Sequence, residues 1–372
     1  MGKLRSFQID LDNLQGLYWA GQTVSGRATV DLESEMKMRE IRLNFEGKGY
    51  VRWTESRGSG QNRHTVTYSA TEYYFNNVMS VFGKGLSGGD EYSLPPGQHT
   101  FPFSFVLPPN LPSSFEGSTG HVRYIIKGTI DRPWRFDDHT VRAFSVLCAL
   151  DLNQLPLASQ GAEATDSKNL CCLCCKSGPI VGTLKVNRIG YVPGESIYFE
   201  ASAQNMTGRE CGMSANLEMI TTFHATRKSR QDRKVINTIQ YQNLNPGDST
   251  VWSGDRFIIP PLPPSYLVNC NIIDIRYIIK LVIDPSGPAF DLNVPIEIII
   301  GTVPLQSAVQ QYQHTLSSVQ PSAPPAIAMP APSYNESILG PTNIKDEGDG
   351  EHTQGQLTFT PTYTYYNWSK TT

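Results

Sequence analysis

Apolar and polar residues alternate with a period of two along most of the chain up to Gly301. The alternation is plainest at residues 7–11, 24–32, 41–45 and 101–107. It is typical of half-buried β-strands, because successive side chains of a strand point to opposite faces of its sheet. Turn residues such as Gly88-Gly89-Asp90 and Pro95-Pro96-Gly97 separate the segments. Short strands with frequent turns predict β-sandwiches rather than a parallel sheet with crossover helices.

A series of motifs in the first half of the chain recurs in the same order in the second half. The matching stretches are residues 16–23 and 189–196, residues 103–109 and 256–261, and residues 122–131 and 275–284. In the last pair, Val122-Arg-Tyr-Ile-Ile-Lys recurs as Ile275-Arg-Tyr-Ile-Ile-Lys. Three matches in one order imply that the chain contains two homologous sandwiches.

These patterns predict an all-β fold of two tandem immunoglobulin-like β-sandwich domains followed by a tail. We expect the first sandwich at residues 1–157, a linker with a cysteine cluster at 158–178, the second sandwich at 179–303 and the tail at 304–372. The tail is rich in Pro, Ser, Thr, Gln and Tyr, has little aliphatic content and shows no periodicity. Such a segment buries too little apolar surface to offset the entropy lost on ordering, so we expect it to be disordered.

Composition and charge narrow the classes of function. The 372 residues carry 31 basic and 34 acidic side chains, for a net charge of −3, so no nucleic-acid partner is expected. The N-terminal residues lack the apolar core of a signal peptide, and no apolar run reaches the roughly 20 residues that span a bilayer. The seven cysteines lack the spacing of a disulfide framework, which indicates a reducing compartment. We therefore expect a cytoplasmic protein.

No catalytic signature is present in the sequence. The seven histidines are dispersed, and H-E-x-x-H, G-x-S-x-G, P-loop and G-x-G-x-x-G motifs are all absent. The expectation is a protein that is not an enzyme and that binds no cofactor and no metal.

Four cysteines are clustered at the predicted domain boundary. They are Cys171, Cys172, Cys174 and Cys175. The simplest interpretation is that they are inert linker residues. Lipidation is an alternative, because Lys176 is adjacent. A zinc or redox site is a third, although four thiolates within five residues fit a tetrahedral mononuclear site poorly.

A basic run lies between two strand patterns of the second sandwich. Its cationic residues are Arg227, Lys228, Arg230, Arg233 and Lys234. The simplest interpretation is the solvated tip of a hairpin. The alternative is a contact for anionic lipid or for the phosphorylated tail of a partner protein, through charge-assisted hydrogen bonds to phosphate oxygens.

Taken together, the motifs resemble those of the α-arrestins, also called arrestin domain-containing proteins, a group that includes thioredoxin-interacting protein. The features that carry the resemblance are the complete Gly-x-Tyr-x-x-Gly-Gln-Thr motif from Gly16 and its counterpart from Gly190-Tyr191 to Ser196, which keeps the Tyr-x-x-Gly spacing but lacks the first Gly; Ser114-Phe-Glu-Gly117 followed by Val122-Arg-Tyr; Asp131-Arg-Pro-Trp134; and the Cys-Cys-Leu-Cys-Cys sequence from Cys171. The resemblance implies arrestin N and C domains. It also implies a cytosolic trafficking adaptor that couples membrane cargo, such as receptors and transporters, to ubiquitin ligases and endosomal sorting, with recruitment to the plasma membrane and endosomes.

One tail motif is intact. Pro321, Ser322, Ala323 and Pro324 match the late-domain motif that the UEV domain of an endosomal sorting protein binds. A proline-flanked tetrapeptide is pre-set near polyproline II, so docking into an aromatic-lined groove costs it little entropy. We therefore expect a UEV-domain partner.

The second kind of tail motif is degenerate. α-Arrestins carry Pro-Pro-x-Tyr sequences that bind WW domains of HECT-type ubiquitin ligases, and the counterparts here are Pro332 with Tyr334 and Pro361 with Tyr363. Each pair lacks the first proline. The loss removes apolar contact worth on the order of 1 kcal/mol, so binding to a WW domain should be weaker. Two weak sites on one tail could act together.

Two other hypotheses remain open at this point. The first is an arrestin-fold coat subunit, like that of retromer, which would not need the tail. The second is a redox regulator that binds thioredoxin, which would need a reactive thiol at Cys211 or Cys270.

Overall fold

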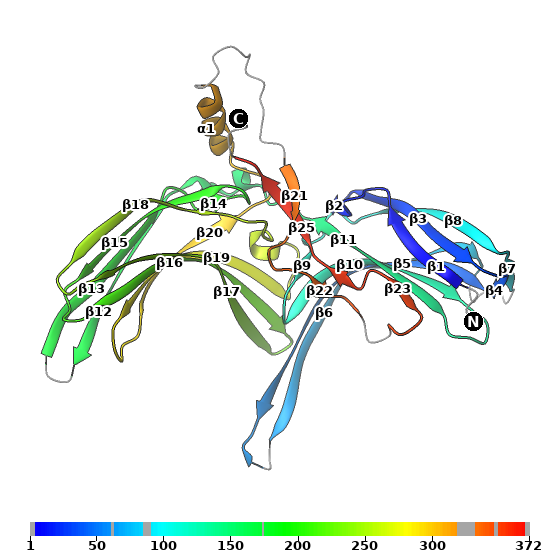
Figure 1. The fold of residues 1–372 in the computed structure, drawn as a ribbon, viewed down its shortest axis with the longest axis horizontal. Helices are drawn as coiled ribbons and strands as arrows, with labels where there is room; N and C mark the ends of the chain where they lie inside the picture. The colour runs from blue at the N-terminus through cyan, green and yellow to red at the C-terminus, as the bar shows by residue number, and fades with distance from the viewer. Residues whose placement is uncertain are drawn as a thin grey trace.

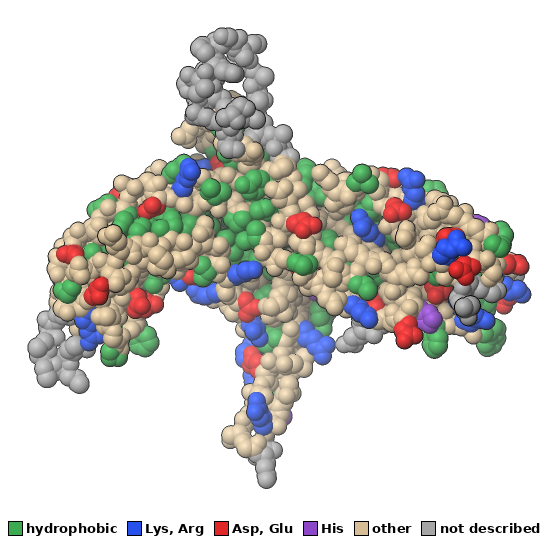
Figure 2. Space-filling model, in the orientation of Figure 1, with side chains coloured by type: hydrophobic (Ala, Val, Ile, Leu, Met, Phe, Trp, Pro, Cys, Tyr) green, Lys and Arg blue, Asp and Glu red, His purple; other side chains and the backbone are tan. Residues whose placement is uncertain are grey.

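The computed structural model describes residues 4–60, 63–84, 91–172, 175–317, 332–345 and 349–368. Two β-sandwiches lie end to end in an elongated arch, and the C-terminal tail passes over the junction between them (Figure 1). A long hairpin of the first sandwich projects away from both bodies (Figure 1). Basic and acidic side chains are interspersed over the face seen in Figure 2. No helix in the described part of the chain is long and apolar enough to cross a membrane.

The first sandwich consists of two main sheets. One has the strand order β1-β3-β8, and the other has the order β2-β11-β10-β5-β6. Its strands are β1 (Leu4–Leu11), β2 (Leu17–Trp19), β3 (Thr23–Leu32), β4 (Met36–Met38), β5 (Glu40–Arg57), β6 (His64–Gly83), β7 (Tyr92–Leu94), β8 (Gly97–Val106), β9 (Phe115–Glu116), β10 (Gly120–Asp131) and β11 (Asp138–Leu147). β5 and β6 form the projecting hairpin.

The second sandwich repeats this plan. Its sheets have the orders β12-β13-β15-β18 and β14-β20-β19-β16-β17. The strands are β12 (Ala162–Cys172), β13 (Cys175–Val186), β14 (Gly190–Tyr191), β15 (Ser196–Asn205), β16 (Cys211–Ala225), β17 (Lys228–Leu244), β18 (Ser249–Ile258), β19 (Ile273–Pro285) and β20 (Leu292–Ile300). Short 3-10 helices lie at Leu152–Gln154, Pro156–Ser159 and Ser265–Leu267.

The alternating apolar residues form the cores, as predicted. Phe7 on β1 is fully buried, and Ile41 and Phe45 on β5 are fully buried as well. Polar residues between them face outward, as in the burial alternation of β5. The predicted all-β fold of two tandem sandwiches is therefore confirmed.

The segment 158–178 differs from the predicted linker. Most of it is β12 and the start of β13, which pair antiparallel at the edge of a sheet of the second sandwich. Ala162 and Ala164 pack against the core, whereas most other β12 side chains are exposed. An edge strand with this many solvent-facing polar residues has the composition of a linker, which explains the error.

Each sandwich contains an equivalent buried hydrogen bond between a tyrosine and a proline loop. The Tyr124 hydroxyl donates to the Pro112 carbonyl oxygen at 2.7 Å, and the Tyr277 hydroxyl donates to that of Pro263 at 2.8 Å. Both tyrosines are fully buried and occupy equivalent places in the repeated Arg-Tyr-Ile-Ile-Lys motif. Each bond fixes a proline loop onto the central strand of its sheet.

The same loops also hold the last strand of each sandwich. The Ser114 hydroxyl accepts from the Val146 backbone N–H at 2.9 Å, and the Ser265 hydroxyl accepts from that of Ile300 at 2.9 Å. The Gly-x-Tyr motifs, as β2 and β14, pair parallel to these last strands. The internal repeat read from the sequence is thus a repeat of hydrogen-bonded structure.

The tail is ordered where the structure describes it, so the prediction of a disordered segment 304–372 is wrong for those residues. It forms α1 (Gln306–Ser317), β21 (Pro332–Glu336), β22 (Thr342–Asn343), β23 (Thr353–Gly355), β24 (Thr358–Phe359) and β25 (Thr362–Tyr366). Ile344, Phe359, Tyr363 and Tyr366 are each at most 6% exposed. In the described part of the tail, these side chains insert into apolar clusters of the sandwiches instead of forming a separate core.

We expect Tyr124→Phe and Tyr277→Phe each to destabilise the protein by about 1–3 kcal/mol, because each leaves a buried proline carbonyl without its donor. Urea or thermal unfolding measures the loss. Tyr73→Phe is the matched control, since Tyr73 is 61% exposed. Equal stability of all three variants would contradict a structural role for the two buried hydroxyls.

Candidate functional site: the domain junction and the docked tail

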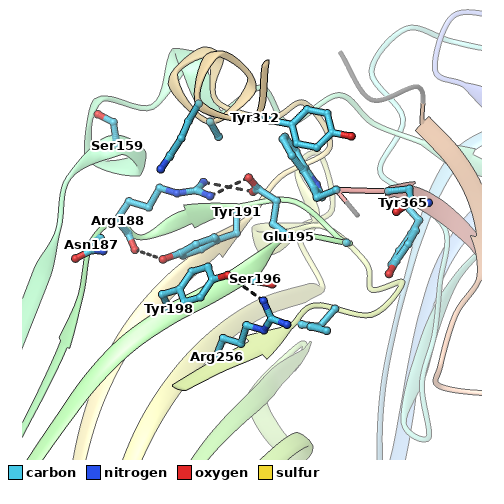
Figure 3. A pocket seen from close by; sticks show the side chains of 16 residues that line it. Ser159, Asn187, Arg188, Tyr191, Glu195, Ser196, Tyr198, Arg256, Tyr312 and Tyr365 are labelled. Atoms are coloured by element: carbon cyan, nitrogen blue, oxygen red, sulfur yellow. Dashed lines mark hydrogen bonds and ion pairs between the residues drawn. The ribbon is translucent and has the colours of Figure 1, made fainter. Parts of the chain in front are cut away.

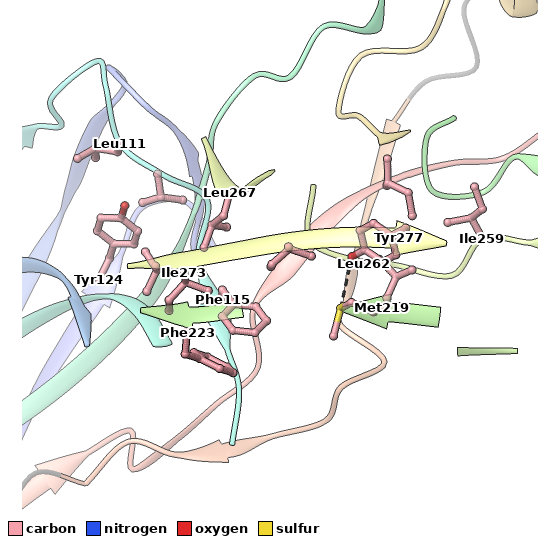
Figure 4. Packing of buried hydrophobic residues seen from close by; sticks show 14 of the residues in the cluster. Leu111, Phe115, Tyr124, Met219, Phe223, Ile259, Leu262, Leu267, Ile273 and Tyr277 are labelled. Carbon is pink, nitrogen blue, oxygen red and sulfur yellow. Dashed lines mark hydrogen bonds between the residues drawn. The ribbon is translucent and has the colours of Figure 1, made fainter. Parts of the chain in front are cut away.

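Apolar side chains from both sandwiches meet at the junction. Phe115 of the first sandwich and Phe223 of the second have ring centroids 6.5 Å apart, and Figure 4 shows them side by side near Ile273. Gly120 completes the contact, because an added Cβ there would lie 3.1 Å from the Phe223 ring and 2.6 Å from the Tyr50 carbonyl oxygen. The two domains therefore share a continuous apolar core.

At the polar edge of the junction, two hydroxyls of the first sandwich donate hydrogen bonds to Asp232 of β17. The Asp232 carboxylate accepts from the Ser118 hydroxyl at 2.9 Å and from the Thr119 hydroxyl at 3.0 Å. Burial alone would raise the pKa of Asp232, but hydrogen bonds from Ser118, Arg230 and Thr119 outweigh it and lower the pKa. The carboxylate is accordingly charged at neutral pH and favours the docked arrangement of the domains.

The predicted basic run lies at the start of β17, around Asp232. Lys228 pairs with Glu55 of the first sandwich, Arg230 Nε lies 3.2 Å from Asp232 Oδ1, and Arg233 Nη1 lies 4.0 Å from Glu218 Oε2. Arg227 and Lys234 are exposed, and no ion pair to either is found among the described residues. Three of the five cations thus have structural partners, while the anion-binding role of the run stays a prediction.

Tyr363 of the tail is buried in the first sandwich. It packs with Leu17 of β2 and Leu147 of β11, and its hydroxyl donates to the Ser114 carbonyl oxygen at 2.9 Å. Burial raises the pKa of Tyr363 well above its ordinary value, so the hydroxyl keeps its proton and remains a donor. The neighbouring Thr362 backbone N–H donates to the Ser145 hydroxyl at 3.0 Å.

Tyr366, three residues further along β25, is held by the second sandwich. Its backbone N–H donates to the Pro193 carbonyl oxygen at 3.0 Å, and its hydroxyl donates to that of Thr302 at 2.8 Å. Gly194 has a positive φ of 95°, and a Cβ there would lie 1.9 Å from the Tyr366 carbonyl oxygen. Only glycine suits this position. β25 therefore contacts both copies of the Gly-x-Tyr motif at once.

The described tail residues from Ile344 to Phe359 follow the first sandwich. β23 pairs parallel with β11, and Gln354 Oε1 accepts from the Phe7 backbone N–H at 2.9 Å. Lys127 Nζ lies 3.1 Å from Asp349 Oδ1, which is almost fully buried. Ile344 and Phe359 fill an apolar cluster on the outer face of β10 and β11.

The structure separates the predicted tail motifs. Pro361 and Tyr363 are buried at the junction, so their Pro-x-Tyr sequence is occupied by intramolecular contacts. Tyr334 is half-buried beside the Leu17 cluster, and Pro332 begins β21. Pro321, Ser322, Ala323 and Pro324 lie outside the described residues. Binding of UEV and WW domains stays a prediction.

A cavity of about 670 Å³ lies between the docked tail, α1 and the second sandwich (Figure 3). Arg188 and Glu195 form an ion pair in its wall, with Nη2 and Oε1 2.8 Å apart. The Arg188 guanidinium also lies 4.3 Å from the Tyr191 ring centroid. Tyrosines, the Arg188–Glu195 ion pair and Arg256 line the cavity, and its described lining contains no histidine or cysteine that could act as a base or nucleophile.

The cysteines offer little chemistry where their side chains are described. Cys211 is fully buried and Cys270 is partly buried, and burial raises the pKa of both thiols. A raised pKa lowers the thiolate fraction that a redox reaction needs, which argues against the thioredoxin hypothesis. The backbones of Cys172 and Cys175 pair at the turn of the β12–β13 hairpin. The side chains of Cys171, Cys172 and Cys175, and all of Cys174, lie outside the described part, as does any test of lipidation.

No group of three metal-binding side chains occurs among the residues that the structure describes. The residues that sequence reasoning missed are the receptors for the tail, chiefly Ser114, Ser145, Gly194 and Thr302. Each belongs to or adjoins a repeated motif or a last strand, which was the available signal. Nothing in the sequence connects them to residues near 363.

Comparison with known proteins agrees with this architecture. Residues 7–153 match the model of the arrestin (or S-antigen) N-terminal domain, and residues 176–305 match that of the arrestin C-terminal domain. Arrestin domain-containing protein 17 of Caenorhabditis elegans is 31% identical over 330 residues, which cover 86% of this chain and 75% of the relative. Human arrestin domain-containing proteins 4 and 1 are 29% and 28% identical, over 88% and 91% of this chain and 81% and 73% of their own lengths.

We expect Tyr363→Ala to release the tail from the junction, because it removes a buried ring and the donor to Ser114; losses for such truncations are about 3–5 kcal/mol. Hydrogen exchange and limited proteolysis of residues 332–368 report the release. Tyr365→Ala is the control on the same strand, since the Tyr365 side chain is partly exposed. Unchanged protection of the tail in Tyr363→Ala would contradict the anchoring role.

A second prediction concerns acid. The lowered pKa of Asp232 means that its contribution is present above the unfolded value of about 4 and is lost as pH falls through the folded value. Asp232→Ala should therefore cost about 1–3 kcal/mol at neutral pH and progressively less below about pH 4. Unfolding at several pH values tests this, with the exposed Asp291→Ala as control. A penalty independent of pH would refute the assignment.

Proposed function

The chain belongs to the arrestin domain-containing (α-arrestin) family, and from this premise we propose that it is an adaptor linking membrane cargo to ubiquitin ligases and endosomal sorting machinery. In this proposal the sandwiches recognise the cargo, and the tail recruits WW-domain HECT ubiquitin ligases and a UEV-domain sorting protein. The protein acts in the cytoplasm and is recruited to the plasma membrane and endosomes. It performs no catalytic step and needs no cofactor.

One observation carries the proposal: the recruitment tail is docked on the junction of the domains that would recognise cargo. Tyr363, the tyrosine of a Pro-x-Tyr sequence, is 1% exposed and donates its hydrogen bond to Ser114. A WW domain needs that tyrosine and Pro361 in its own groove. Docking on the sandwiches and binding to a ligase therefore compete for the same side chains.

The competition has a quantitative consequence. If only a fraction of molecules has the tail released, the apparent dissociation constant for a WW domain rises by the inverse of that fraction. The degenerate motif is weak already, because it lacks one proline. Recruitment of a ligase through Tyr363 thus depends on an event that detaches β25 from the sandwiches.

The experiment compares the full chain with a synthetic peptide of residues 356–372, which presents Tyr363 without the sandwiches. We expect a HECT-ligase WW domain to bind the peptide at least about tenfold more tightly than the full chain, because docking hides the motif. Tyr363→Ala should abolish binding by the peptide, and Tyr365→Ala should not. Equal affinities of peptide and full chain would show that docking does not occlude the motif.

The proposed binding of a UEV-domain sorting protein is tested in the full chain. Replacing Pro321 and Pro324 together by alanine should remove binding of a UEV domain, because both prolines are needed to hold the peptide in the groove. Tyr363→Ala should leave UEV binding intact. If neither domain depends on any of these residues, the proposed adaptor loses its mechanism.

A further inference from the structure

The turn between β10 and β11 exposes two aromatic side chains. Trp134 is 99% exposed and Phe136 is 81% exposed. Trp134 has a positive φ of 60°, in the left-handed region that residues with a Cβ adopt at a cost. The Trp134 ring therefore takes no part in the core of the sandwich and is accessible to a partner.

Ion pairs at the base of the turn hold this conformation. Asp137 Oδ1 accepts from the Arg132 backbone N–H at 3.1 Å, and Arg132 Nη1 lies 2.9 Å from Asp138 Oδ2. Below them, Asp131 pairs with both Arg39 and Arg42. These hydrogen bonds and ion pairs hold the loop in one conformation before a partner binds, so little conformational entropy is lost on binding.

The charges of the turn are divided between base and apex. The three aspartates, Asp131, Asp137 and Asp138, each lie within 4.0 Å of an arginine side chain. Arg135, between the two aromatics, is exposed, and no ion pair to it is found in the described part of the chain. The apex therefore presents an aromatic ring, a cation and a second aromatic ring, while the acidic groups are neutralised behind it.

The turn also lies far from the junction, at the end of the first sandwich where His352 of the tail stacks on one side of Phe136, with ring centroids 5.8 Å apart. β10 begins at Gly120, which packs on Phe223 of the second sandwich, and runs for 12 residues to Asp131. The turn is thus roughly 35 Å from the junction, given about 3.3 Å per residue. Figure 1 shows the turn that follows β10 at the outer end of the first sandwich.

The internal repeat places an exposed aromatic at the equivalent turn. Phe290, which follows the equivalent Asp284 between β19 and β20, is 85% exposed. Its surroundings differ, because Lys168 Nζ bonds the Phe290 carbonyl oxygen at 2.8 Å and lies 5.5 Å from the ring. Among the residues that the structure describes, the turn of the first sandwich combines two exposed rings with a cation for which no ion pair is found, and the turn of the second sandwich does not.

We propose that the turn at residues 132–138 is a membrane-contact site, in which Trp134 and Phe136 enter the interfacial zone of an anionic bilayer and Arg135 contacts its phosphates. Tryptophan is enriched at the level of lipid headgroups because its ring is apolar and its N–H is polar. An arginine next to it is attracted to the negative surface of the cytoplasmic leaflet. A protein pocket could also accept an aromatic, but the free cation and neutralised acids favour an anionic surface. The site goes beyond the adaptor function and requires none of the tail motifs.

The test uses the full chain and flotation with two kinds of vesicle, one of phosphatidylcholine alone and one of equimolar phosphatidylcholine and phosphatidylserine. We expect stronger binding to the second kind. Arg135→Ala should weaken that binding about fivefold, the effect of one basic residue near an anionic surface. Trp134→Ala combined with Phe136→Ala should weaken binding to both kinds. Leu14→Ala, which removes another exposed apolar side chain (92% exposed), is the control and should change nothing.

A local readout separates this turn from any other contact. The emission of Trp134, taken as the difference between the wild type and Trp134→Phe, should shift to the blue on addition of anionic vesicles and be quenched by brominated lipid. Arg135→Glu should abolish the shift, and unfolding curves should show that all variants are folded. Vesicle binding without any change in Trp134 emission, or no vesicle binding at all, would overturn the proposal. Neither result bears on binding of the WW or UEV domain.

Discussion

The structure depends on one hydrogen bond that is made twice, from a buried tyrosine hydroxyl to a proline carbonyl. In the first sandwich, Tyr124 fixes the loop after Pro112, and the same loop then holds the last strand through Ser114. The second sandwich repeats both contacts at Tyr277 and Ser265. Because these bonds are buried, breaking one leaves an unsatisfied carbonyl in an apolar core. The constraint is therefore strong, and it positions the loop that receives the tail.

The outer side of that loop explains why the tail docks where it does. Ser114 uses its hydroxyl for the sandwich, and its carbonyl oxygen remains available to the Tyr363 hydroxyl. The tail thus binds a surface that folding of the domain has already ordered, and it supplies only a few side chains. This arrangement connects the stability of the first sandwich with the accessibility of the Pro-x-Tyr sequence at Pro361 and Tyr363, on which the proposed adaptor function depends.

The sequence was informative wherever a residue's environment is local or periodic. Alternation predicted the strands, and the repeated Arg-Tyr-Ile-Ile-Lys segments predicted two equivalent sandwiches. It failed where partners are distant. Tyr363 is held by Ser114, and Lys228 of the basic run pairs with Glu55, across separations that no local pattern encodes. The prediction of a disordered tail from its composition failed for a related reason. A segment that packs into the apolar clusters of another domain needs few apolar residues of its own.

β25 docks on the loop at residues 16–23 and on the equivalent loop at residues 189–196, so its length sets the distance between these two loops. Tyr363 is bound to the first sandwich and Tyr366 to the second, and three residues of extended chain separate them by roughly 10 Å. Both tyrosines can be seated only while the two loops keep that spacing. A rotation of one sandwich against the other would unseat one end, and the loss of one anchor would weaken the other. A relative movement of the two domains would in this way expose the peptide that β25 contains.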